Sequence, residues 1–184
     1  LKQVPLRQRM QDAPRVLIVG EIYVRRDDFA VDELIQSFSH KGIIGKISGT
    51  TEWIHYLDFV REYELRKRLK LVPFWRRRLF SAPQRGLLKL KAEKAWKHWV
   101  EKQVTSALSS CELLPPVPHD MDHIMQNTSE HFLNHELNSE IAISSGVAAT
   151  AMEEGYSGVV NISPFACLIG RVIEGIYTPW AREK

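Results

Sequence analysis

The sequence predicts an α/β fold: a short parallel sheet of strand order 2-1-3, with a long helical insertion between its second and third strands. Three observations predict it. Apolar runs at residues 16–19, 43–47 and 157–162 are short and rich in branched side chains, as in strands buried on both faces of a sheet. Segments with helical periodicity separate these runs, which is the pattern of β-α-β units. A basic stretch at about 50–115 interrupts that pattern.

The chain opens with a polar segment. Residues 1–14 contain two prolines and show no clear period, so we expect a linker or arm there. A single α/β domain is expected to follow over residues 15–184, since 184 residues suit one domain with an appended helical part. The chain starts at Leu1 and ends in charged residues directly after a predicted helix, and we expect it to be a piece of a longer protein.

The first β-α-β unit is expected over residues 15–47. After the first strand, Asp27 or Asp28 can cap a helix whose apolar residues recur at helical spacing. Gly42 is expected to end that helix, because glycine tolerates the left-handed backbone that commonly follows a helix. The second strand comes next, and the crossover that joins the two parallel strands should be right-handed.

Two long helices are expected within the insertion. The first is predicted from about residue 50 to 70, where apolar side chains recur at helical spacing. Pro83 and Gly86 are expected to mark a break, since both residue types disfavour a helix interior. The second long helix is therefore predicted over 88–110.

The positive charge of the chain belongs to this insertion. Between Arg61 and Lys102 there are 14 basic and 4 acidic residues, a net charge of +10. The rest of the chain holds 11 basic and 18 acidic residues, a net charge of −7. The insertion is therefore the part expected to meet anionic groups.

The third strand is preceded by a connector and a helix. Residues 120–137 look like a polar, partly helical connector. A helix capped by Asn138 or Ser139 and ended by Gly155 is expected to lead into the strand. After the strand, Cys167 is expected in or just before the first turn of a final helix.

Cys167 is the residue that points most directly to chemistry. Free backbone N–H groups and the positive end of the dipole at a helix start favour a thiolate, which binds metals and attacks electrophiles. A buried apolar cysteine is the competing interpretation. Cys111 and Cys167 are the two cysteines of the chain, too few for a disulfide framework, so a reducing compartment such as the cytoplasm is expected.

The predicted topology brings two unusual strand ends together. In the order 2-1-3 the crossovers reverse direction between the first and third strands, and ligands of such Rossmann-like, three-layer folds bind at that switch point. We therefore expect one cleft there, which Cys167 faces. The candidate cofactor-binding residues are those that follow the first and third strands: Gly20, Glu21, Ser163, Pro164 and Phe165.

Two segments resemble a known family. Gly20-Glu21-Ile22-Tyr23-Val24-Arg25, with Thr51-Glu52-Trp53 opening the next helix, resembles the start of a domain in 2-hydroxyacyl-CoA dehydratase-related proteins, which include large CoA-enzyme-activase proteins. The segment from Gly158 to Cys167 is similar to that family's Pro-Phe-x-Cys-Met-Pro-Gly motif after a buried strand. The resemblance covers roughly residues 15–60 and 128–184. This chain has Leu168-Ile169 where Met-Pro would be expected.

The resemblance implies an iron–sulfur protein. In the family this cysteine helps to ligate a cluster, and the dehydratase components use an electron from an ATP-driven activator to dehydrate 2-hydroxyacyl-CoA. By resemblance, Cys167 is a cluster ligand, acyl-CoA is a candidate substrate, and the parent would be a lyase or take part in its electron-transfer activation. A [4Fe–4S] cluster normally needs four ligands. The rest of a parent chain or a partner subunit would have to supply the others, and this domain would be catalytically incomplete alone.

Other residues permit purely structural interpretations, or a different kind of metal site. Glu21 can be a solvated carboxylate that closes a strand. His119 and His123, and likewise His131 and His135, repeat the four-residue spacing that suits a divalent metal on a helix. The sequence lacks His-Glu-x-x-His, and a polar connector with solvated histidines is the favoured interpretation.

The segment Leu71–Phe80 mixes aromatic residues with Arg76, Arg77 and Arg78. Such segments dock on acidic proteins, bind coenzyme A phosphates, grip nucleic acid or lie on anionic membranes. A solvated insertion with its aromatics tucked into the core is favoured, and nucleic acid is not the expected partner. The alternative function is a cluster-free α/β binding module that recruits an acidic partner, a nucleotide ligand or nucleic acid through the insertion.

No apolar run approaches the length of a membrane span, and the start lacks a signal-peptide pattern.

Overall fold

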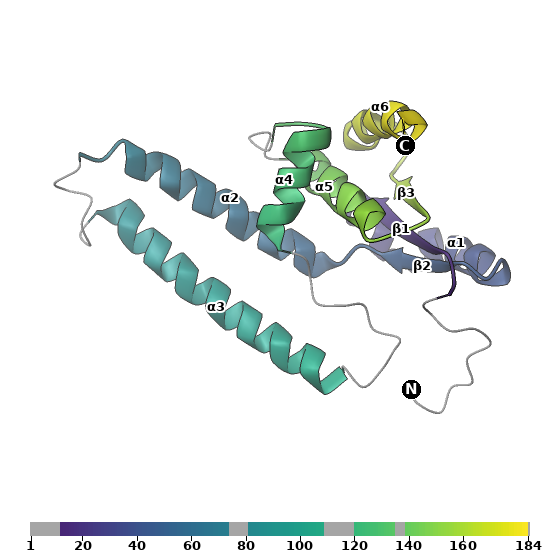
Figure 1. Cartoon of the computed structure of the whole chain (residues 1–184), viewed down its shortest axis with the longest axis horizontal. Helices are drawn as coiled ribbons and strands as arrows, with labels where there is room; N and C mark the ends of the chain where they lie inside the picture. Colours follow the sequence, from purple (N-terminus) through teal and green to yellow (C-terminus); the bar gives the residue numbers. More distant parts are fainter. Residues whose placement is uncertain (1–11, 74–80, 109–119, 135–138, 184) are drawn as a thin grey trace. The chain divides into compact units, whose positions relative to one another are not determined.

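The computed structural model describes residues 12–73, 81–108, 120–134 and 139–183 (Figure 1). The chain divides into two compact units. The described part of one unit falls within Thr51–Pro118 and forms a helical hairpin, and that of the other falls within Pro5–Thr50 and His119–Lys184 and forms an α/β unit.

The α/β unit contains a three-stranded parallel sheet of order β2-β1-β3, which confirms the predicted fold class and strand order. Val16 faces Gly45 on one neighbouring strand and Gly158 on the other. Leu17, Ile18 and Val19 are at most 2% exposed, because a central parallel strand is covered on both faces. The strands are β1 (Arg15–Gly20), β2 (Ile44–Ile47) and β3 (Gly158–Ile162).

Helices cover both faces of this sheet. α1 contacts β2, whereas α5 contacts β1 and β3, and in Figure 1 α5 lies in front of the sheet and α1 behind it. This is the arrangement expected when right-handed crossovers run in opposite directions from β1. α6 packs against β3 and α5, and α4 packs on α5. The helices of the unit are η1 (Val24–Arg26), α1 (Asp28–His40), α4 (Met121–His131), α5 (Glu140–Glu153) and α6 (Leu168–Glu183).

Small residues let α4 and α5 approach closely. A Cβ atom added to Gly146 would lie 2.3 Å from the carbonyl oxygen of Ile124, so glycine is required at that crossing. Thr128 donates a hydrogen bond to the carbonyl of Ala142 at 2.8 Å and is fully buried. The prediction that 120–137 is partly helical is confirmed, since α4 spans Met121–His131. The prediction of a polar connector is wrong for this helix, which buries Met121, Ile124, Met125, Asn127 and Thr128.

The hairpin consists of α2 (Thr50–Lys70) and α3 (Ala82–Leu108). The helix predicted over 50–70 is confirmed, but the break predicted at Pro83 and Gly86 is wrong, since α3 begins before both. Proline is tolerated in the first turn, where its missing N–H has no partner to lose. Gly86 packs against α2: an added Cβ atom would lie 3.0 Å from Leu65 Cδ2.

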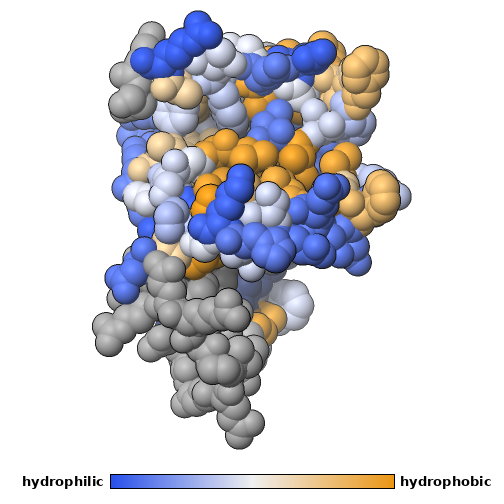
Figure 2. Space-filling model, turned by 90° about the vertical axis from the view of Figure 1, so that its right-hand side faces the viewer, coloured by the Kyte–Doolittle hydropathy of each residue, from blue (hydrophilic) through white to orange (hydrophobic). Residues whose placement is uncertain are grey.

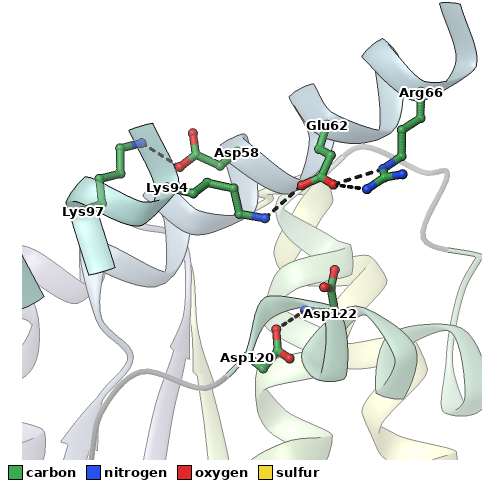
Figure 3. A network of polar contacts seen from close by, with 7 residues as sticks. All are labelled: Asp58, Glu62, Arg66, Lys94, Lys97, Asp120 and Asp122. Carbon is green, nitrogen blue, oxygen red and sulfur yellow. Dashed lines mark hydrogen bonds and ion pairs between the residues drawn. The ribbon is translucent and has the colours of Figure 1, made fainter. Parts of the chain in front are cut away.

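Charged side chains link the two helices of the hairpin (Figure 3). Lys97 Nζ lies 2.6 Å from Asp58 Oδ2, and Lys94 Nζ lies 2.9 Å from Glu62 Oε2. Arg66 also donates to the Glu62 carboxylate, from one turn further along α2. The hydrogen bond from Lys94 holds the pKa of Glu62 below its ordinary value against the opposing effect of burial, and the hydrogen bond from Arg66 adds to the lowering. Among the helices that the structure describes, none combines the length and apolar character that crossing a membrane requires.

Candidate functional site

The loop between β3 and α6 holds Cys167 immediately before the helix. The N–H of Cys167 donates to the carbonyl of Pro164 at 3.2 Å, which closes a tight turn. Ala166 sits in that turn with φ +61°, in the left-handed region that costs a residue with a Cβ atom about 1–2 kcal/mol. Cys167 is a half-buried free thiol, so its side chain is not fully buried in the aliphatic core. The predicted position of this cysteine, at the start of the last helix, is confirmed.

An open cavity of about 480 Å³ adjoins the thiol. It brings together Ser163, Pro164 and Phe165, the predicted residues that follow β3, with Cys167 itself. Phe165 is 98% exposed. Figure 2 views the side of the molecule on which α1 and α6 lie in Figure 1, and shows hydrophobic residues gathered in a band among hydrophilic ones. The cavity is lined by Asn161, Ser163, Pro164, Phe165, Ala166, Cys167, Gly170, Arg171, Glu174, Tyr177 and Thr178.

The first turn of α6 is fitted closely onto the end of β3. A Cβ atom added to Gly170 would lie 2.0 Å from Ser163 Oγ and 2.6 Å from Ser163 Cβ, so a larger residue would push the loop from the helix. Asn161 Nδ2 donates to the carbonyl of Gly170 at 3.4 Å. The conformation of the cysteine loop therefore depends on a glycine three residues after the cysteine itself.

The remainder of the cavity wall comes from one face of α6. Arg171 Nη1 lies 2.8 Å from Glu174 Oε2, so the cationic group of this wall already has an anionic neighbour. The hydroxyl of Tyr177 donates to the carbonyl of Ser144 at 2.7 Å, which ties α6 to α5. Burial raises the pKa of Tyr177 above its ordinary value, so the phenol stays protonated and acts as a donor.

The end of β1, at Gly20 and Glu21, lies beside the end of β3. The N–H of Glu21 donates to the carbonyl of Ile162 at 3.0 Å, so the two strand ends meet as the topology predicts. Gly20 has φ +120°, and an added Cβ atom would lie 1.9 Å from that carbonyl oxygen. Glu21 Oε2 accepts a hydrogen bond from the N–H of Val24 at 2.8 Å, which gives this carboxylate a local structural role. Both residues lie outside the described lining of the cavity.

Sequence reasoning missed Glu140, a second carboxylate at the same end of the sheet. Its Oε1 accepts a hydrogen bond from the N–H of Ile22 at 3.0 Å, across 118 residues of chain. Burial, and then the nearby charge of Glu21, raise the pKa of Glu140, whereas the hydrogen bond from Ile22 and the charge of Arg25 oppose that rise. The Ser139-Glu140 pair at a predicted helix start was the available signal, but it indicates only a cap.

Tyr23 and Arg25, which follow Glu21 closely in the sequence, have different environments. Arg25 is 4% exposed and donates to the carbonyl of Ser48 at 3.0 Å, so its guanidinium is part of the interior. Tyr23 is 77% exposed. An anionic ligand would therefore meet Tyr23 before Arg25.

The histidine pairs do not form a metal site within the described residues. His123 Nε2 lies 3.3 Å from Glu153 Oε2, and the ring of His131 contacts that of Phe132 edge-on. His119 and His135 lie outside the described residues, as does Cys111. Across residues 12–73, 81–108, 120–134 and 139–183, no three histidine, cysteine, aspartate or glutamate side chains come together to hold a metal ion.

The aromatic and arginine-rich segment is described only at its start. Leu71 is 84% exposed, whereas Arg76, Arg77 and Arg78 lie outside the described residues. The predicted role of this segment stays a prediction.

Comparison of the chain with protein-family models, with curated proteins and with solved structures gave no match.

Proposed function

We propose that this chain is a domain of a 2-hydroxyacyl-CoA dehydratase/activase-related iron–sulfur protein, in which the loop from Ser163 to Cys167 forms one wall of a cluster or acyl-CoA cleft. One observation carries the proposal: a half-buried free thiol directly before α6, beside an open cavity at the carboxyl end of the parallel sheet. Ligands of open parallel sheets bind at that end.

The donor set limits what the domain can hold alone. The described residues supply one cysteine and no group of three potential ligands, whereas a [4Fe–4S] cluster normally has four. These residues alone do not provide enough ligands for an iron–sulfur cluster. In this proposal Cys167 is one ligand of a site completed by the rest of a parent chain or by a partner subunit, and the domain is not catalytically complete.

Iron analysis of the full-length protein, purified without oxygen, tests the proposal. The wild type is expected to carry iron and acid-labile sulfide, and Cys167→Ser should lower both, because a serine hydroxyl replaces a thiolate ligand. Cys111→Ser is the matched control, and it should leave both contents unchanged. Unchanged iron in the Cys167→Ser protein would contradict the ligand role, and so would an equal loss in the two variants.

Alkylation by iodoacetamide gives a readout that does not depend on iron. Because Cys167 borders an open cavity, its thiol should react in the folded protein, and a bound cluster or acyl-CoA should slow that reaction. A thiol that reacts only after denaturation would show that the cavity does not admit a ligand to the sulfur.

The hairpin supports a second candidate function, a cluster-free binding module. Its described helices expose basic side chains that include Arg85, Lys91 and Lys102 on α3. Such a module would recruit an acidic partner, a nucleotide ligand or nucleic acid, and its function would survive Cys167→Ser. Binding of an anionic partner that is lost on charge reversal in the hairpin, and kept in Cys167→Ser, would favour this candidate.

A further inference from the structure

Helix α3 has two faces of different chemistry. The face toward α2 carries the buried Leu90 together with Lys94 and Lys97, which pair with acidic side chains of α2. Both acidic residues of α3 are also engaged with α2: Glu93 Oε2 lies 3.0 Å from Arg61, and Glu101 Oε1 lies 2.6 Å from His55. The acidic groups of α3 are therefore used inside the hairpin.

The opposite face of α3 carries an apolar stripe. Leu88, Ala92, Ala95 and Trp99 follow one another at intervals of four, three and four residues, and Trp96 adjoins them. All five are exposed, with 46% exposure for Leu88, 65% for Trp96 and 58% for Trp99. This spacing places them on one side of a helix and is the spacing through which one helix packs on another. The two alanines leave room between larger side chains, which a bulky side chain of a second helix can enter.

Basic residues flank the stripe on both sides. Arg85 and Lys89 lie on one flank, and Lys91 and Lys102 lie on the other, all exposed. Among the residues that the structure describes, Lys89 alone of these four has an acidic side chain within 4 Å, that of Glu93 at 3.8 Å within α3. The flanks are therefore positive, and charged residues beside an apolar seam select a partner with the opposite charge.

We propose that this face of α3 docks an amphipathic helix of a partner protein, apolar along its centre and acidic along its flanks. A second copy of the chain would bring like charges together along both flanks. Nucleic acid would place phosphates over Leu88 and the alanines, where the helix offers no cation. A membrane surface would gain little from a stripe that includes two alanines. The proposal rests on the second candidate function, binding through the hairpin, and not on the role of Cys167.

A synthetic peptide tests the proposal by fluorescence anisotropy with the whole chain. The probe is an amphipathic helix of four heptads with leucine at its core positions and glutamate at its flanking positions; its twin carries lysine at those flanks. We expect the acidic peptide to bind and the basic twin not to. Trp96→Ala and Trp99→Ala should each weaken binding about 30-fold, as central tryptophan contacts do. Lys91→Glu with Lys102→Glu should weaken it about 10-fold and reduce its dependence on salt.

Val104→Ala is the matched control, because Val104 is 54% exposed on α3 but lies off the stripe. Its affinity for the acidic peptide should equal that of the wild type. Urea unfolding of the two tryptophan variants should match the wild type too, since both rings are exposed. A large loss of stability would instead show that this face is covered within the chain, and would overturn the proposal.

The remaining outcomes separate this inference from the binding function on which it rests. Tryptophan-dependent binding of duplex DNA or of phosphatidylserine vesicles, without binding of the acidic peptide, would overturn the helix partner but leave a binding module. Self-association abolished by Trp96→Ala would assign the face to a second copy. Equal binding of both peptides would overturn the charge argument. Failure to bind any of these probes would overturn both the inference and the second candidate function.

Discussion

Single residues decide the shape of the cysteine loop. Gly170 lets the first turn of α6 sit directly on Ser163, and Ala166 accepts a left-handed backbone in the turn that presents Cys167. Glu140 joins the start of α5 to the backbone that follows β1. These contacts join segments far apart in the sequence, so the geometry around the thiol is a property of the folded unit rather than of the motif alone.

Gly170→Ala should therefore destabilise the α/β unit. The added methyl group would overlap Ser163, and such overpacking costs about 1–3 kcal/mol in the free energy of unfolding. Gly175→Ala in the same helix is the control: nothing lies within 4 Å of its added Cβ atom, and alanine should stabilise α6 by about 0.5–1 kcal/mol. Urea denaturation measures both. The Gly170→Ala cost should shrink when Ser163 is also changed to glycine, and a cost that does not change would contradict the overlap.

The helices and strands depend on how they pack against one another as well as on their own residues. α5 is apolar on nearly all sides and is buried from Ala142 to Ala151, as expected of a helix between a sheet and other helices. α2 and α3 join through ion pairs and hydrogen bonds as well as through buried apolar side chains such as Leu90, since their contact faces also carry charged residues. The stability of the hairpin should therefore depend on pH more than that of the α4–α5 pair.

Lys94→Met should reveal this pH dependence. Glu62 has a pKa below its ordinary value of 4.5 in the folded chain, so its stabilising contribution is present above pH 4.5 and is lost as the pH falls through the folded pKa. The substitution removes the main cause of that shift and should cost about 0.5–1 kcal/mol at pH 7, and less as the carboxylate is protonated. Unfolding followed at several pH values measures the difference.

Lys89→Met is the matched control for the hairpin. Lys89 is 72% exposed and lies 3.8 Å from Glu93, four residues along the same helix. Replacing Lys89 should lower the free energy of unfolding by no more than about 0.3–0.5 kcal/mol. If the two lysine variants behaved alike, or if the effect of Lys94→Met did not change with pH, the pair between α2 and α3 would not contribute as described.

At the scale of the whole molecule, the α/β unit is organised around one central strand. β1 pairs with both other strands, and α5 packs on it. Its side chains Leu17, Ile18 and Val19 are the centre of the core. Damage to this strand should therefore spread to the two strands that depend on it for their hydrogen bonds.

Ile18→Ala should destabilise the α/β unit as a whole. The side chain is 0% exposed, and removing three carbons from such a site costs about 2–5 kcal/mol. Hydrogen exchange should speed up together across β1, β2 and β3, because the strands form one cooperative sheet. Ile54→Ala, at a position 43% exposed in the hairpin, should leave those exchange rates unchanged. Faster exchange confined to β1 would contradict the cooperative sheet.

The sequence by itself determined the parallel sheet, its order and the place of Cys167 before the last helix. Periodicity, caps and crossover rules act locally or through chirality, and a single chain reveals them. Only the tertiary structure decided that α3 runs through Gly86, that α4 is buried, and that Glu140 meets Ile22. Each depends on a close approach between distant segments: Leu65 against Gly86, Ile124 against Gly146, and one carboxylate against a remote backbone N–H. Residue propensities contain no information about such neighbours, because packing supplies the free energy that overrides them.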